Sequence, residues 1–141
     1  LGYLYENGDG IAQDFVEAAK WYRLAAEQGD NDAQNNLGVL YERGLGVVQG
    51  FAEAAKWYRL AAEQGNPLSQ YNLGLLHLQG TGAEQDDVTA AHWLVKAAEQ
   101  GDAAAQYSVA DLYFNGQGVT QNYEEASKWL ERAAATEPEL S

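Results

Sequence analysis

Apolar positions along the chain recur at the spacing of an α-helix. The apolar and aromatic residues of the segment 31–43 fall three or four positions apart, so they share one helix face: Ala33, Leu37, Leu40 and Tyr41. Asp30 suits the N-cap of such a helix, and Gly44 suits the left-handed residue that ends it. The pattern therefore predicts a helix between these two residues.

The helical pattern itself recurs every 36 residues. The sequence EAAKWYRLAAEQG of residues 17–29 returns unchanged at residues 53–65. The same offset relates Trp21, Trp57, Trp93 and Trp129, as well as Gly8, Gly44, Gly80 and Gly116, and Gly10, Gly46, Gly82 and Gly118. A repeat of this length is typical of an α-solenoid, in which each pair of helices buries its apolar face against the next pair.

Each repeat also contains a second helix with its own start and stop signals. The residues that suit its N-cap are Asp14, Gly50, Asp86 and Asn122, and the glycines that suit its end are Gly29, Gly65 and Gly101. Gly38 and Gly74 lie in the middle of first helices, where glycine costs about 1 kcal/mol relative to alanine. We therefore expect a neighbouring helix to cross closely at these two glycines.

Together these positions resemble a known repeat family. The second repeat carries Ala33-x3-Leu37-Gly38-x2-Tyr41-x2-Gly44-x-Gly46-Val47, and then Ala54-Ala55-x-Trp57-x3-Ala61-Ala62-x2-Gly65. This motif resembles the Sel1-like repeat, a relative of the tetratricopeptide repeat with Gly-x-Gly in the loop between its helices. The resemblance covers the whole chain as one domain, 1–141, with repeats at 1–30 (incomplete), 31–66, 67–102 and 103–141. It implies an all-α fold, namely an α/α solenoid with a right-handed superhelix of 36-residue helix-turn-helix repeats.

The resemblance also implies a role. Proteins with this repeat are adaptors that assemble complexes, often in bacterial signalling, envelope or host-interaction proteins and in eukaryotic degradation machinery, but a fold does not name a partner. The chain departs from the pattern at His77, which replaces a tyrosine, at Ala110, which replaces a glycine, and at Thr136, where glutamine is expected. A cysteine-rich branch of the family is associated with β-lactam binding or hydrolysis. Because this chain has no cysteine, a β-lactam-type hydrolase or small-molecule binder is the least favoured function.

The amino-acid composition limits the classes of molecule that the chain is expected to bind. The chain has 21 acidic and 8 basic residues and a formal charge of −13, which opposes binding to nucleic acid or to anionic membranes. The same charge favours a protein partner with basic patches. No apolar run is long enough for a transmembrane helix, and no signal-peptide pattern is present. The chain begins without Met, so we expect it to be a fragment; its compartment stays open, with the cytoplasm, the bacterial periplasm and secretion all compatible.

Candidate chemistry is sparse. The Gly-x-Gly loops follow helices rather than strands and lack the third glycine of a dinucleotide fingerprint, so we interpret them as structural. His77 and His92 lack the spacing of zinc ligands; we expect His77 in the core and His92 on a solvated face. No Gly-x-Ser-x-Gly motif is present. The sequence therefore predicts a non-enzymatic protein with no metal or cofactor.

The sharpest functional signal is a second stripe on the first helices, away from their core face. In tetratricopeptide-like solenoids these positions line the concave groove. The residues of this stripe and its margin are Tyr3, Glu6, Asn35, Val39, Glu42, Tyr71, Leu75, Leu78, Gln79, Tyr107, Asp111, Phe114 and Asn115. The stripe becomes aromatic and aliphatic toward the C-terminal half, which favours binding of a partner peptide or helix.

Two alternatives stay open. The stripe residues can instead pack against the first helix of the neighbouring repeat. The chain can also be a structural fragment of a longer repeat protein that self-associates through open solenoid ends. The opposite face of the second helices carries the i,i+4 pairs Arg23–Glu27 and Arg59–Glu63, which we interpret as a solvated stripe.

Overall fold

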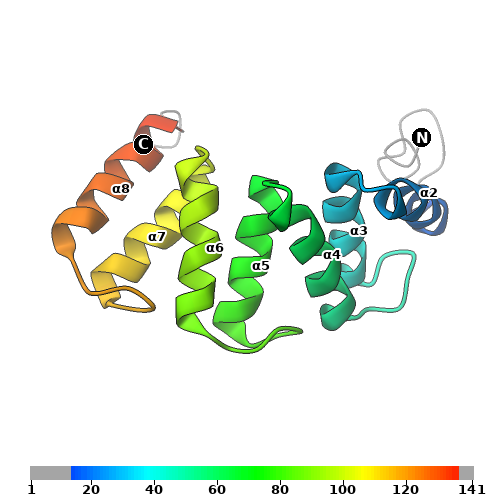
Figure 1. The fold of residues 1–141 in the computed structure, drawn as a ribbon, viewed down its shortest axis with the longest axis horizontal. Coiled ribbons are helices and arrows are strands. Elements are labelled where there is room, and N and C mark those ends of the chain that lie inside the picture. The colour runs from blue at the N-terminus through cyan, green and yellow to red at the C-terminus, as the bar shows by residue number, and fades with distance from the viewer. Residues whose placement is uncertain (1–13, 137–141) are drawn as a thin grey trace. The chain divides into compact units, whose positions relative to one another are not determined.

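The computed structural model describes residues 14–136, which form seven α-helices and no strand. In chain order these are α2 (Phe15–Glu27), α3 (Asn31–Arg43), α4 (Phe51–Glu63), α5 (Pro67–Gln79), α6 (Asp87–Glu99), α7 (Ala103–Asn115) and α8 (Tyr123–Thr136) (Figure 1). Helix α2 is the second helix of the first repeat, and each later repeat contributes two helices. The predicted all-α fold of paired helices is confirmed.

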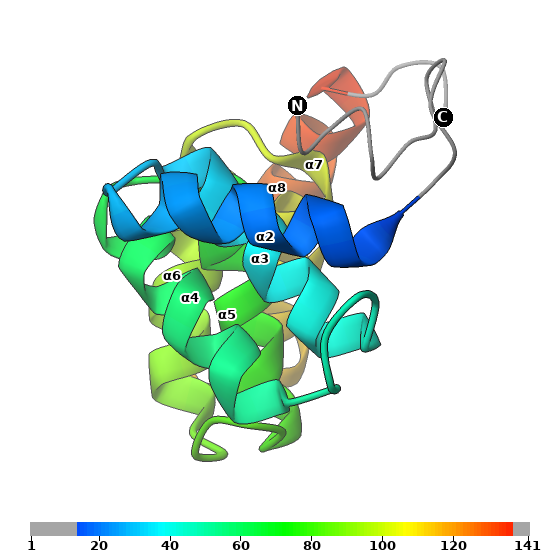
Figure 2. The same ribbon diagram turned by 90° about the vertical axis from the view of Figure 1, so that its right-hand side faces the viewer.

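The helices fall into two compact parts, Leu1–Asn66 and Pro67–Ser141, which we call the N-terminal and C-terminal halves. In the N-terminal half, α3 packs against both α2 and α4 (Figure 2). In the C-terminal half, α5 packs on α6, α6 on α7, and α7 on α8 (Figure 1). The single domain that the sequence predicts for residues 1–141 stays a prediction.

The predicted caps are in place. The Asp14 carboxylate accepts hydrogen bonds from the backbone N–H groups of Val16 and Glu17, at 3.0 and 3.2 Å. The Asn122 side chain accepts one from the N–H of Glu125 at the start of α8. At the other end of a helix, Gly44 has φ +69°, the left-handed conformation that favours glycine. Local sequence therefore defines where these helices begin and end.

Two mid-helix glycines allow close helix packing, as the sequence predicts. A Cβ atom placed on Gly38 of α3 would lie 2.6 Å from the Tyr58 ring of α4. A Cβ on Gly74 of α5 would lie 2.7 Å from the Leu94 side chain of α6. Each glycine therefore makes room for one large buried side chain of the second helix.

The Gly-x-Gly loops are structural elements. A Cβ on Gly118 would lie 2.1 Å from the carbonyl oxygen of Asp87, so the loop before α8 lies directly on the first turn of α6. In the N-terminal half, a Cβ on Gly46 would lie 2.1 Å from the carbonyl oxygen of Phe15. Both glycines also have positive φ, +74° and +75°. In these two loops the second glycine therefore packs on the preceding repeat.

Candidate functional site

The stripe on α5 lies at the border between core and solvent. Tyr71, Leu75 and Leu78 are partly buried and pack against a hydrophobic cluster. That cluster is built from α6, α7 and α8, and its members include Leu94, Val109 and Trp129. The packing alternative therefore accounts for part of this stripe, while each side chain still keeps some exposed surface.

The equivalent stripe on α7 is more open. Tyr107 is 37% exposed and Phe114 is 57% exposed, and Asp111 between them is exposed as well. The Phe114 ring also packs on Tyr123 of α8, with 5.2 Å between ring centroids. Two accessible aromatic rings on either side of a carboxylate form a surface that suits recognition of a protein segment.

On α3, the stripe is polar and largely engaged within the fold. Asn35 is buried, with 6% of its surface exposed, and Val39 and Glu42 are half-buried. The Glu42 carboxylate accepts a hydrogen bond of 2.7 Å from the hydroxyl of Tyr58 on α4. Burial of Tyr58, and after it this hydrogen bond, raises the pKa of the Tyr58 hydroxyl. Glu42 therefore has a structural partner, whatever else it contacts.

The Glu42–Tyr58 contact explains a pattern that the sequence reasoning missed. The same offset of 16 residues pairs Leu78 with Leu94 and Phe114 with Leu130. A carboxylate thus faces a tyrosine hydroxyl in one repeat, whereas apolar residues stand at both positions in the next two. Leu78 and Leu94 pack in the same cluster. The apolar character of Leu78 therefore follows partly from its partner in the second helix.

The remaining stripe residues are placed as follows. Gln79 and Asn115 are exposed at the ends of their helices. Tyr3 and Glu6 lie outside the described residues. The assignment of the whole stripe to one partner-binding groove stays a prediction.

A buried glutamine in each of the first helices α3, α5 and α7 is a second feature that the sequence reasoning missed. Gln34 and Gln106 donate from Nε2 to the carbonyl oxygens of Ala26 and Ala98, both at 3.1 Å. Gln64 donates in turn to Gln34 Oε1 at 2.9 Å. In the last repeat Thr136 takes the place of that outer glutamine, and its hydroxyl lies 3.0 Å from Oε1 of Gln106. Recurrence of glutamine at positions 34, 70 and 106 was the available signal.

The two histidines have the predicted surroundings. His77 is buried, and its Nδ1 lies 2.8 Å from the carbonyl oxygen of Glu84, where it can donate a hydrogen bond. His92 is exposed and packs edge-on against Trp93. Within residues 14–136, no group of three or more His, Asp or Glu side chains is placed to hold a metal ion.

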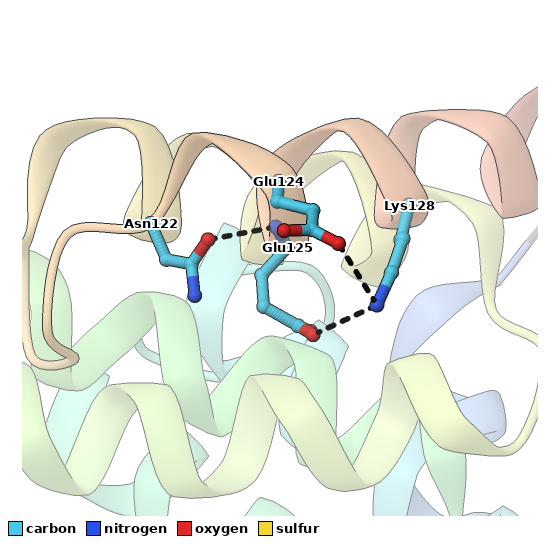
Figure 3. A network of polar contacts seen from close by, with 4 residues as sticks. All are labelled: Asn122, Glu124, Glu125 and Lys128. Carbon is cyan, nitrogen blue, oxygen red and sulfur yellow. Dashed lines mark hydrogen bonds and ion pairs between the residues drawn. The ribbon is translucent and has the colours of Figure 1, made fainter.

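The outward stripe of α2 is less solvated than the sequence indicates. The Arg23 guanidinium donates to the Tyr41 hydroxyl of α3 and lies over the Tyr41 ring, 5.6 Å from its centroid. Arg23 thus contributes to packing between two helices. The ion pairs on α8 do follow the helix-surface pattern: Lys128 lies 3.8 Å from Glu124 and 3.7 Å from Glu125 (Figure 3).

These features define an α-helical repeat protein built from paired helices. The chain belongs to the Sel1 repeat family, whose repeat matches residues 1–30, 31–66, 67–102 and 103–135. Members of this family are generally protein–protein interaction scaffolds. No curated protein matches the chain. Over the part of the chain that the structure describes, no helix has both the length and the apolar character needed to cross a membrane.

Three solved structures resemble the chain. A protective antigen of uropathogenic Escherichia coli strains with an SLR fold is 42% identical, with a TM-score of 0.93 over 97% of this chain and 29% of its own. A Sel1 repeat protein from Oxalobacter formigenes is 38% identical, with a TM-score of 0.91 over 96% of this chain and 56% of its own. Cysteine-rich protein B of Helicobacter pylori shares the fold. It is 20% identical, with a TM-score of 0.70 over 89% of this chain and 90% of its own. The chain therefore spans well under two thirds of the first two proteins.

Proposed function

We propose that this chain is a non-enzymatic interaction scaffold that binds a partner peptide or helix in a concave groove along its first helices. The observation that carries the proposal is the exposure of Tyr107 and Phe114 on either side of Asp111. Large aromatic side chains that stay accessible on a rigid helix are favourable anchors for a protein partner, because little conformational entropy is lost when they are buried.

Tyr71, Leu75 and Leu78 occupy the equivalent stripe on α5, where each keeps part of its surface exposed. Their partial burial fixes their side chains, so their remaining surface is presented in one arrangement before a partner arrives. Pre-organisation of this kind lowers the cost of binding. The acidic charge of the chain, −13, further favours a partner with basic residues through faster association.

The test is a quantitative affinity capture from a lysate of the source organism with three baits. These are the parent chain, a Tyr107→Ala/Phe114→Ala variant, and a control variant Val88→Ala, whose substituted side chain is 67% exposed on α6. We expect a protein retained by the parent and control baits but lost by the double variant, with unchanged helicity in circular dichroism. Retention of every protein equally by all three baits, or of none, would contradict the proposal.

Self-association is the second candidate function. Leu130 on α8 is 46% exposed, and a second copy is one way to bury it. Analytical ultracentrifugation over about a hundredfold range of protein concentration separates self-association from partner binding. A strictly monomeric mass counts against self-association, whereas a concentration-dependent mass that Leu130→Ser abolishes supports it.

A further inference from the structure

Helix α7 ends at an asparagine that is followed directly by glycine, Asn115-Gly116. Both residues are exposed. The equivalent ends of the first helices in the second and third repeats, Arg43 and Gln79, are exposed as well, although another repeat follows each of them. Exposure at this position is therefore a property of the repeat itself. The counterpart in the first repeat, Asn7, lies outside the described residues.

An asparagine followed by glycine can deamidate without an enzyme. Once a base has removed the proton of the Gly116 backbone nitrogen, this nitrogen attacks Cγ of the Asn115 side chain. The C–N bond of the side-chain amide breaks, and its nitrogen takes up a proton and leaves as ammonia. The product is a five-membered succinimide ring, whose closure is favoured because both reacting groups belong to one chain. Water then opens the ring at either carbonyl, which leaves aspartate or isoaspartate at position 115.

The C-terminal cap of α7 holds this reaction back. The N–H of Gly116 donates to the carbonyl oxygen of Leu112, and the N–H of Gln117 donates to the same oxygen at 2.9 Å. The nitrogen that has to attack is therefore engaged in a hydrogen bond. Helix ends open locally at a small cost in free energy, so the last turn of α7 has to fray before the ring can form.

The loop between α7 and α8 keeps the cap closed (Figure 1). Gln121 donates from Nε2 to the carbonyl oxygen of Phe114 at 2.9 Å, and the N–H of Asn122 donates to the carbonyl oxygen of Tyr113 at 2.9 Å. A Cβ on Gly116 would lie 3.0 Å from Cβ of Gln121. Because the Gln121 side chain lies directly beside Gly116, its removal should make the cap open more often.

Deamidation would change the contact between the fourth repeat and the third. A carboxylate at position 115 stands at the C-terminal end of α7, where the helix dipole disfavours negative charge. Isoaspartate also adds one methylene to the main chain, just before the loop whose Gly118 packs on the carbonyl oxygen of Asp87. Both effects destabilise the end of α7 and the packing of the loop on α6.

We propose that Asn115 is a site of spontaneous deamidation, that opening of the α7 cap sets its rate, and that the product loosens the fourth repeat on the third. The reaction consumes only water and releases ammonia. The chain therefore carries a time-dependent modification that does not depend on any partner.

The test is ageing of the whole chain at mildly alkaline pH and physiological temperature, followed by tryptic peptide mapping with mass spectrometry. We expect conversion at Asn115, with isoaspartate as the larger product. Gln79-Gly80, at the equivalent position of the third repeat, is the matched control, because its longer side chain would have to form a six-membered ring. Asn122 is the second control, since it is exposed but followed by the bulky Tyr123. Both controls should stay unmodified.

The rate of conversion tests the role of the cap. A synthetic peptide of residues 109–121, too short for a stable helix, should convert about five- to a hundredfold faster than the chain, because opening the cap breaks two hydrogen bonds. Gln121→Ala in the whole chain should speed conversion about two- to tenfold, whereas Thr120→Ala, in the same loop, should leave the rate unchanged. Asn115→Gln should stop conversion, and its unfolding midpoint should stay constant on ageing while that of the parent falls.

Each part of the proposal has its own contrary result. An Asn115 side chain that stays unmodified for more than about a hundred half-lives of the peptide would overturn the site. Equal rates in the peptide and the chain, or an unchanged rate in Gln121→Ala, would overturn control by the cap. If the aged parent unfolds at the same temperature as aged Asn115→Gln, the loosening of the fourth repeat is wrong.

Discussion

The third and fourth repeats, both in the C-terminal half, carry equivalent positions on similar helices, yet some of these positions differ in burial. Leu94 and Leu130 differ by one repeat length and are 0% and 46% exposed. Stability in a helical repeat protein comes from each repeat and its nearest neighbours. The comparison therefore shows that the same position is core or surface according to what packs next to it.

The largest expected effect contrasts these two leucines directly. Leu94→Ala should lower the free energy of unfolding by about 3 kcal/mol, because it leaves a cavity against Gly74 inside the cluster. Leu130→Ala should lower it by less than about 1 kcal/mol, since half of that side chain is already in water. Urea denaturation followed by circular dichroism measures both. Equal losses would show that Leu130 is buried in solution.

The next prediction concerns the loop that joins the fourth repeat to the third. Gly118→Ala combines backbone strain at φ +74° with a clash of the new Cβ against the Asp87 carbonyl, so we expect a loss of about 2 kcal/mol. Gly101→Ala is the matched control. Gly101 has φ +98° but open space around its Cβ position, so only strain, about 1 kcal/mol, is expected.

Amide hydrogen exchange tests whether the loss of stability in Gly118→Ala comes from loosening of the fourth repeat on the third. If the loop holds the fourth repeat on the third, Gly118→Ala should increase amide exchange in α6 and α7 more than Gly101→Ala does. Exchange that rises equally in both variants would mean that Gly118 affects only its own loop.

Much of this architecture was predictable because it depends on short-range chemistry. Asp14 and Gly44 define helix ends through local hydrogen bonds and backbone conformation, and each acts within a few residues. Gly38 and Gly74 indicated close helix crossings because a glycine in a helix needs a packing reason. The 36-residue recurrence then showed that these helix ends and helix crossings fall at equivalent positions in successive repeats.

The state of the candidate stripe was not predictable in the same way. The exposure of Tyr71 and Tyr107 depends on what packs beside each helix, which the pattern within a single helix does not show. The engagement of Glu42 with Tyr58, and of Thr136 with Gln106, arises between helices. Comparison of positions across repeats, rather than along one helix, would have revealed the first of these pairings.

A smaller effect is expected where the last repeat departs from the others. The Thr136 hydroxyl lies 3.0 Å from Oε1 of Gln106, where the preceding repeat has Gln100 donating to Gln70 at 2.8 Å. Thr136→Val should cost about 1 kcal/mol, because it removes a partner from a buried amide. Thr120→Val, in the exposed loop before α8, is the control and should be neutral. Thermal unfolding compares the two, and an equal midpoint would show that Gln106 is satisfied without Thr136.

The smallest expected effect concerns the N-caps of α6 and α8, the second helices of the third and fourth repeats. Helix α6 begins at an anionic cap, Asp86, whereas α8 begins at the neutral Asn122. Hydrogen bonds from Thr89, chiefly from its hydroxyl and then from its N–H, hold the pKa of Asp86 below its ordinary value of 3.8. A lowered pKa in the folded state means that the contribution is present above pH 3.8 and is lost as the pH falls below it.

Asp86→Asn should therefore weaken the chain slightly at pH 7 and flatten part of the decline in its unfolding midpoint between pH 4 and pH 3. The converse variant, Asn122→Asp, should add acid sensitivity at α8 and is the matched test, since it creates the same charge at the equivalent cap. Thermal unfolding at closely spaced pH values measures the difference between each variant and the parent, so the other carboxylates of the chain cancel. Parallel pH curves for all three proteins would show that the Asp86 cap contributes no pH dependence, and that the third and fourth repeats respond to acid alike.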